Sequence, residues 1–516
     1  MIDLAQYDGP LFTDAYRKIL GSAPGISEPG SAYHAASPPG FRERIVRCIW
    51  FDQTLATDRL RTDDGRKLRV LSPGWWNLEA GPDFRNAALR VATDAVVKGD
   101  VEVHLHASLW KGHGHHTDPA YNRVVLHVTL WRDTADDTVT TAAGQAVPQV
   151  TLEPYLTAPI AELADAVDPA EYPEASDASA GACHSLLEQG KVTVEWLAHF
   201  LDHAGDQRIA DKARRLARRH ASADDDQVLY EAVAEGLGYK RNKAPAGELA
   251  RRLPLAAVRE RVGQRPQGLS ASLAVEALTF GVAGLLPEGG DLVFDDTERA
   301  YREDLAAAWR ELGGDLDGEA LDPAQWSSAG TRPPNFPTRR IAALARLVAA
   351  HLDRGLGQGL RDALGPTDQG HLAPRQLSRR RAALLDVFLS VRHPFWDVRC
   401  RFAGKPMSRP ARLIGPDRAH TLVINGVLPA LLYQARRDGD RPFEELLHQL
   451  YAAYPKLPST SITRFMAMRM FGREEKELKS LRSARRQQGL YQLHGDYCSS
   501  DAPACRRCPL VRLLET

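Results

Sequence analysis

GPDF at residues 81–84 and GDVEVHLH at residues 99–106 are the two segments from which the fold class and a candidate site follow. Successive side chains of a strand point to opposite faces of a sheet. In the second segment this alternation puts apolar side chains on one face and carboxylates and imidazoles on the other: Val101, Val103 and Leu105 against Asp100, Glu102, His104 and His106. The apolar face can pack in a core, and the polar face suits a metal or proton-transfer site.

Asp83 opens an earlier predicted strand, from Phe84 to Val91, in which apolar and polar residues also alternate. If the two strands pair, the carboxylates of Asp83 and Glu102 lie close together and repel each other unless a divalent cation binds between them. The sequence therefore predicts Mg²⁺ or Mn²⁺ held by Asp83 and Glu102, with Asp100 and His106 as further ligands.

These residues resemble the two motifs of the PD-(D/E)xK phosphodiesterase superfamily, which has a restriction-endonuclease-like fold. Pro82-Asp83 matches the first motif and Glu102-Val103-His104 the second, except that histidine stands where lysine is usual. The resemblance implies a metal-dependent nuclease acting on DNA or RNA. It makes Asp83, Glu102 and His104 the catalytic residues, with His104 orienting or deprotonating the attacking water.

Two alternatives remain open from the same residues. The histidine in the lysine position also fits a catalytically inactive nucleic-acid-binding or scaffold protein with a decayed nuclease fold. His104, His106 and His127 could instead form a zinc or iron site that acts on a small molecule. A third, plainer interpretation is that the polar face belongs to an edge strand and meets solvent.

A histidine-rich loop follows the second strand. His113 is interpreted as an ordinary loop residue, whereas His115, His116, Asp118, Tyr121 and His127 are possible accessory site residues. Asp118 and Pro119 predict the start of a short helix, and residues 124–131 predict the next strand.

The whole chain of 516 residues has no net charge, so its overall charge neither favours nor excludes a nucleic-acid partner. We expect a cytoplasmic protein without a membrane segment, because the N-terminus lacks a signal peptide and apolar runs are short. The predicted fold class is α+β, with a mixed-sheet restriction-endonuclease-like domain, a large mainly helical region and a cysteine-rich metal loop. The predicted boundaries are an irregular arm at 1–40, the nuclease-like domain at 41–156, a linker at 157–190, helices at 191–480 and the tail at 481–516.

The C-terminal tail contains Cys498, Cys505 and Cys508, three of the six cysteines in the chain. Their spacing resembles the iron–sulfur loop of helix-hairpin-helix DNA glycosylases, although no cysteine follows Cys508. The tail predicts a structural metal, either Zn²⁺ or a [4Fe–4S] cluster, and the alternative is three reduced cysteines that bind no metal. The fourth ligand stays open between His494, Cys183, Cys400 and Cys48. Arginines near the tail are candidate nucleic-acid contacts: Arg485, Arg486, Arg506 and Arg507.

Across about residues 41–510 the chain is similar to an uncharacterised bacterial family, a domain of unknown function numbered 2851. The resemblance is carried by residues 81–84 and 99–104, by 115–121 and 126–128, by 276–278 with 280–281, by 335–337 and by the cysteine tail. It implies no activity, so the nuclease hypothesis depends on the local motif.

Overall fold

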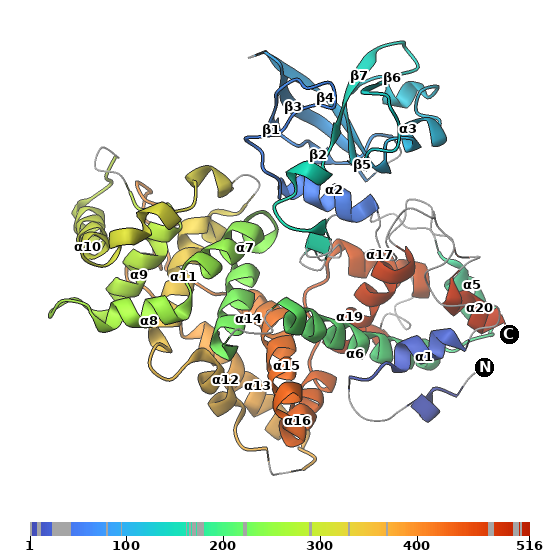
Figure 1. Ribbon diagram of the computed structural model, residues 1–516. Coiled ribbons are helices and arrows are strands. Elements are labelled where there is room, and N and C mark those ends of the chain that lie inside the picture. The colour runs from blue at the N-terminus through green and yellow to red at the C-terminus, as the bar shows by residue number, and fades with distance from the viewer. Residues whose placement is uncertain are drawn as a thin grey trace.

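The computed structural model describes most of the chain. The described residues are 3–7, 12–22, 43–78, 81–93, 95–160, 163–164, 167, 172, 180–219, 224–287, 292–328, 331–367, 370–472, 479–498, 505 and 508–515. The protein has the α+β architecture that the sequence predicts: a sheet near the N-terminus, then a long series of helices (Figure 1).

A mixed seven-stranded sheet holds the two decisive segments. Its strand order is β1-β3-β4-β5-β7-β6, with β2 also paired to β3. Neighbours are antiparallel from β1 to β4 and parallel from β4 through β5 to β7, and β6 returns antiparallel to β7. The strands are β1 (Leu68–Ser72), β2 (Trp75–Trp76), β3 (Phe84–Val91), β4 (Val96–His106), β5 (Val124–Trp131), β6 (Thr138–Thr140) and β7 (Ala146–Thr151).

β4 lies in the centre of the sheet, and both of its faces are buried near Glu102. The interpretation of the polar face as a solvent-facing edge strand is therefore wrong. Gly99 permits the close approach of β5, because a Cβ at this position would lie 2.7 Å from the carbonyl oxygen of Arg123.

The two faces of the sheet are covered differently. Helix α2 (Glu43–Asp52) packs its Ile49 and Trp50 against the apolar face, where Val101 and Val103 are fully buried. The polar face is covered by α3 (Leu109–Gly112) and the short 3-10 helix η2 (Pro119–Tyr121). In Figure 1, α2 lies between the sheet and the helical region.

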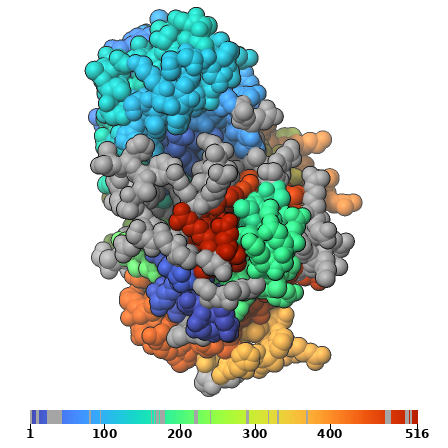
Figure 2. Space-filling view, turned by 90° about the vertical axis from the view of Figure 1, so that its right-hand side faces the viewer, coloured from blue at the N-terminus to red at the C-terminus, as the bar shows by residue number. Residues whose placement is uncertain are grey.

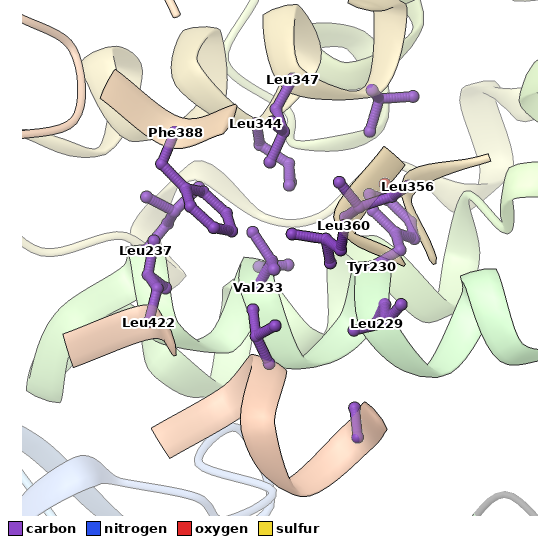
Figure 3. Close-up of a cluster of buried hydrophobic side chains, with 14 of the residues drawn as sticks. Leu229, Tyr230, Val233, Leu237, Leu344, Leu347, Leu356, Leu360, Phe388 and Leu422 are labelled. Atoms are coloured by element: carbon purple, nitrogen blue, oxygen red, sulfur yellow. The ribbon is translucent and has the colours of Figure 1, made fainter. Parts of the chain in front are cut away.

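Helices from the middle of the chain pack around one large hydrophobic core. Leu229, Tyr230 and Val233 of α7 point towards side chains of α11, α12 and α13 (Figure 3). The helices that follow the sheet in this part of the chain are α6 (Val194–Arg219), α7 (Asp225–Arg252), α8 (Leu255–Gly263), α9 (Ala271–Val282), α10 (Asp296–Leu312), α11 (Pro337–Ala350), α12 (Leu356–Leu364), α13 (Pro374–Leu389), α14 (Pro416–Leu422), α15 (Leu428–Asp438) and α16 (Arg441–Ala452).

A second core brings together segments from both ends of the chain. It contains α1 (Ala15–Gly21), α5 (Ala182–Glu188), the start of α6, and the C-terminal helices α17 (Ser461–Phe471), α19 (Ala484–Leu493) and α20 (Pro509–Glu515). Short helices are only marginally stable alone, so packing of their apolar side chains on this core stabilises them. Ile19 of α1, for example, is fully buried against it.

Two of the predicted segments need correction. The irregular arm predicted at residues 1–40 contains the helix α1, and the predicted linker at 157–190 contains α5. Residues 55–61, which precede β1, form turns and two isolated bridges, at Leu55 and Arg61. The rest of the predicted arm, residues 23–40, lies outside the described residues. Within the described part of the chain, every helix is too short or too polar to cross a membrane.

Candidate metal centre

Strand register places the site residues in one row across the sheet. Phe84 pairs with Val101, so Asp83 lies next to Glu102 at the start of β3. Glu102 is the partner of His127 on β5, and His127 is the partner of Gln149 on β7. His104 lies two residues beyond Glu102 and therefore shares its face.

The two carboxylates lie side by side but have different partners. The Asp83 backbone N–H donates to Glu102 Oε2 at 3.0 Å, and the Val103 N–H donates to Asp83 Oδ2 at 3.1 Å. Asp83 Oδ1 forms an ion pair with Arg47 of α2 at 2.9 Å, and both side chains are more than nine-tenths buried. The positive charge next to Asp83 is thus the guanidinium of Arg47. The sequence had predicted a metal ion shared with Glu102 at this position, and it gave no indication of the arginine.

Three histidines converge next to Glu102. His104 Nε2 lies 3.2 Å from His113 Nδ1 and 3.3 Å from His115 Nε2. Glu102 Oε1 lies 3.2 Å from His115 Nε2 and 3.5 Å from His104 Nε2. The donor atoms of His104, His113 and His115 all lie within 4.8 Å of one another, so the three side chains are close enough to share one metal ion.

A tight turn brings His113 and His115 to the sheet. The backbone of His113 donates to Leu109 and that of His115 donates to Trp110, so the loop folds back onto α3. Gly114 between them has φ +79°, a conformation that favours glycine. His113 is exposed and His115 is buried, so the group can be reached from solvent on the His113 side.

The interpretation of His113 as an ordinary loop residue needs correction, because it is a member of this group. The feature of the sequence that could have indicated this role is the segment Gly112-His113-Gly114-His115, in which two histidines are separated by one glycine. Arg47 and Gln149, which also contact the site, carried no sequence signal.

A chain of hydrogen bonds fixes how His104 presents its ring. Gln149 Nε2 donates to Asp63 Oδ2 at 2.8 Å, which turns its Oε1 towards His127 Nδ1 at 2.9 Å. His127 must then carry its proton on Nδ1 and accept at Nε2 from His104 Nδ1, 2.9 Å away. The remaining nitrogen of His104, Nε2, is left with its lone pair directed at His113 and His115.

Burial keeps these imidazoles neutral. Desolvation lowers the pKa of His127 to about 3 and that of His115 to about 4. Desolvation, together with the neighbouring His127, also lowers the pKa of His104 well below its ordinary value. Neutral imidazole is the form that binds metals, so His104 and His115 are in the ligand form at neutral pH.

The structure places the remaining predicted site residues outside this group. Asp100 accepts from the Asn86 backbone at 3.0 Å, and His106 stacks on Trp131 with its Nδ1 4.0 Å from Asp133. Asp118 caps η2 as predicted, His116 is exposed, and the ring of Tyr121 stacks on His115 at 3.8 Å.

Two of the predicted nucleic-acid contacts have partners within the fold. Arg485 forms an ion pair with Asp206 at 2.6 Å, and Arg486 with Asp202 at 3.0 Å. These pairs hold α19 against α6, so a phosphate would have to compete with both aspartates. Arg506 and Arg507 lie outside the described residues.

The cysteines of the tail meet a fourth cysteine. Cys183, at the start of α5, lines the same cavity as Cys498, Cys505 and Cys508. Desolvation raises the pKa of Cys183 to about 12 and raises the pKa of Cys498 and Cys508 above the ordinary thiol value. No disulfide bond joins any of the six cysteines, all of which the structure describes.

Fold and site together define an α+β protein with a candidate metal centre on the polar face of a mixed sheet. A family model described as a protein of unknown function (DUF2851) matches residues 43–457. The chain belongs to this family, as its sequence motifs indicated. No curated protein and no solved structure matches the chain.

Proposed function

We propose that this protein is a metal-dependent hydrolase of phosphodiester bonds in nucleic acid, with its metal held by His104, His113 and His115. The observation that carries the proposal is the convergence of these three imidazoles beside the buried carboxylate of Glu102.

The spacing of the donor atoms fits a transition metal. Ligands about 2.1 Å from a tetrahedral Zn²⁺ lie about 3.4 Å from one another. The separations of 3.2 Å and 3.3 Å from His104 Nε2 to the other two histidines agree with this value. Imidazole donors favour zinc, iron or a related ion over Mg²⁺, which prefers oxygen. This differs from the Mg²⁺ or Mn²⁺ that the carboxylates alone predict.

Glu102 is placed to act as the general base. A divalent ion in such a site lowers the pKa of a water molecule bound to it. Glu102 Oε1 lies 3.2 Å from His115 Nε2 and 3.5 Å from His104 Nε2, so it would lie beside a metal ion held by the histidines and within reach of water bound to that ion. Its other oxygen accepts from the Asp83 backbone, which fixes the orientation of the carboxylate. His104 then serves as a ligand, in place of the water-activating role that the motif implies.

The order of elements supports phosphodiesters as the substrate class. The order of α2, the antiparallel strands β1, β3 and β4, a short helical segment and the parallel strand β5 resembles the order of elements that the motif leads us to expect, and this likeness supports the proposal. Asp83 and Glu102 occupy its two motif positions on neighbouring strands.

The test is cleavage of DNA, RNA and bis(p-nitrophenyl) phosphate by full-length protein loaded with Zn²⁺, Mn²⁺ or Mg²⁺. Glu102→Gln should keep its metal and lose about 100-fold or more in turnover, because general-base catalysis contributes about that much. His116→Ala, an exposed histidine of the same loop, is the matched control and should retain activity. Metal-loaded protein that cleaves none of the substrates, or an active Glu102→Gln variant, would overturn the proposal.

A second candidate is a zinc or iron enzyme that acts on a small molecule. It is favoured by the donor set, since three imidazoles rather than two carboxylates form the metal group. Its ligands would be His104, His113 and His115, because both ring nitrogens of His127 are engaged by His104 and Gln149. Metal-loaded protein that hydrolyses small esters or amides and leaves nucleic acid intact would favour this candidate. Salt-dependent nucleic-acid binding without turnover would instead favour the inactive binding protein.

A further inference from the structure

Four cysteines from segments distant in sequence line one cavity. Cys183 belongs to α5, Cys498 ends the π-helical turn η10 (His494–Cys498), and Cys505 and Cys508 precede α20. The second view of the molecule shows α5 in green directly beside the C-terminal segment in red (Figure 2), and Figure 1 places α5 and α20 together as well.

We propose that Cys183 supplies the fourth ligand to Cys498, Cys505 and Cys508, and that the four thiolates hold a [4Fe–4S] cluster. The other two cysteines are remote from this cavity: Cys48 is buried in α2 against the sheet domain, and Cys400 lies 3.5 Å from the sulfur of Met407. This site is separate from the candidate hydrolase centre and does not depend on it.

The spacing of the sulfurs favours a cluster over a single zinc ion. Four sulfurs bound about 2.3 Å from a tetrahedral Zn²⁺ lie about 3.8 Å from one another. Among the described residues, no three cysteine sulfurs lie within 4.8 Å of one another, although the four line one cavity. A cubane separates its thiolates further, because each binds a different iron atom.

The surroundings of the cavity suit such a cluster. Its wall is apolar, with Met466, Met470 and Leu493 among the lining residues. Arg469 donates a hydrogen bond to Cys505 Sγ at 3.2 Å, and hydrogen bonds to ligand sulfurs tune iron–sulfur clusters. The carbonyl of the same arginine accepts from the Gly181 N–H at 2.9 Å, which holds the start of α5 at the cavity.

The first experiment measures the metal content of full-length protein purified without oxygen. Wild-type protein and Cys400→Ser, the matched control, should each hold about four iron atoms and four sulfides per chain, with the broad visible absorption of a cluster. Cys183→Ser should lose most of its iron while its circular dichroism stays that of a folded helical protein. One zinc ion per chain in place of iron, no metal at all, or full iron content in Cys183→Ser would overturn the proposal.

A second measurement keeps the test valid if Cys183→Ser does not fold. In wild-type protein, alkylation followed by mass spectrometry should show Cys183, Cys498, Cys505 and Cys508 protected together. Oxidative removal of the iron should expose all four at once and leave the labelling of Cys400 unchanged. Labelling of Cys183 while the other three stay protected would contradict its role as a ligand.

Discussion

His104 Nδ1 lies 2.9 Å from His127 Nε2, so that two histidines on neighbouring parallel strands share one buried hydrogen bond. His127 in turn is held by Gln149, and Gln149 by Asp63. This chain of contacts decides which nitrogen of His104 is available to a metal. In the proposed metal centre, His127 would therefore orient His104 and would not itself be a ligand.

Replacing Gln149 by leucine should weaken metal binding without touching a ligand. The His127 Nδ1–H would lose its acceptor, and the tautomer of His104 would no longer be fixed. Loss of such an outer contact typically lowers metal affinity about 10–100-fold. Competition with a chelator measures the affinity, and Gln145→Leu, an exposed position just before β7, is the control. Unchanged affinity in Gln149→Leu would contradict the orienting role.

Removing a direct ligand should have a larger effect. His113→Ala and His115→Ala each delete one of three converging donors, and we expect metal affinity to fall further than in Gln149→Leu. Isothermal titration with Zn²⁺ measures the change, with His116→Ala as the control from the same loop. Equal affinities in the His113 and His116 variants would remove His113 from the site.

Asp83→Asn should act mainly on stability. It breaks a buried pair and leaves the Arg47 guanidinium without its carboxylate, which costs about 3–5 kcal/mol. The double variant Asp83→Asn with Arg47→Met should recover part of this loss, since no charge is then left buried. Denaturant unfolding followed in the sheet domain measures both. If Asp83→Asn instead abolishes metal binding at unchanged stability, Asp83 is a ligand as the sequence motif implies.

Acid should destabilise the sheet domain of the metal-free protein. The folded-state pKa of His127 is about 3, below the ordinary 6.5, so the unfolded chain binds a proton that the folded chain does not. The contribution of neutral His127 to the free energy of unfolding is therefore fully present above about pH 6.5. It falls by about 1.4 kcal/mol for each pH unit below this value, until the pH reaches the folded-state pKa. Hydrogen exchange of β4 and β5 amides between pH 7 and pH 5 in the presence of chelator measures this loss. His127→Asn should show a shallower pH dependence, and an equal slope would contradict the assignment.

Gly114→Ala should strain the loop that carries two of the ligands. A side chain at φ +79° costs about 1–2 kcal/mol, which the loop can relieve by moving His113 and His115 apart. We expect a loss of both stability and metal affinity, measured by thermal unfolding with and without Zn²⁺. Gly112→Ala, at the end of α3 where a Cβ would meet no atom closer than 3.9 Å, should change neither.

The sequence located the strands of the site because their patterns are local. The alternation of Val101 and Val103 with Glu102 and His104 predicted β4, and the predicted bounds of β3 and β5 agree with the structure. Asp118 was correctly identified as a helix cap, since its side chain accepts from the Ala120 N–H. The mainly helical region predicted after the sheet contains α9 and α13, among other helices.

Contacts between distant segments could not be read from the sequence. α1 and α5 are short and lack strong helical patterns, and they become ordered only by packing on the second core. Arg47 sits on the helix that covers the apolar face, and its pairing with Asp83 depends on how that helix lies on the sheet. Arg485 and Arg486 had the composition of a nucleic-acid patch, but α6 supplies the aspartates that bind them.

By itself, the sequence determined the α+β fold class, the pairing of acidic and imidazole side chains on one strand face, and the family to which the chain belongs. These properties follow from residue alternation and spacing, which act over a few positions. The tertiary structure decided which imidazoles meet, which carboxylate faces a guanidinium and which cysteine joins the C-terminal three. The physical reason is that such encounters depend on strand register, loop folding and helix packing, which join residues distant along the chain.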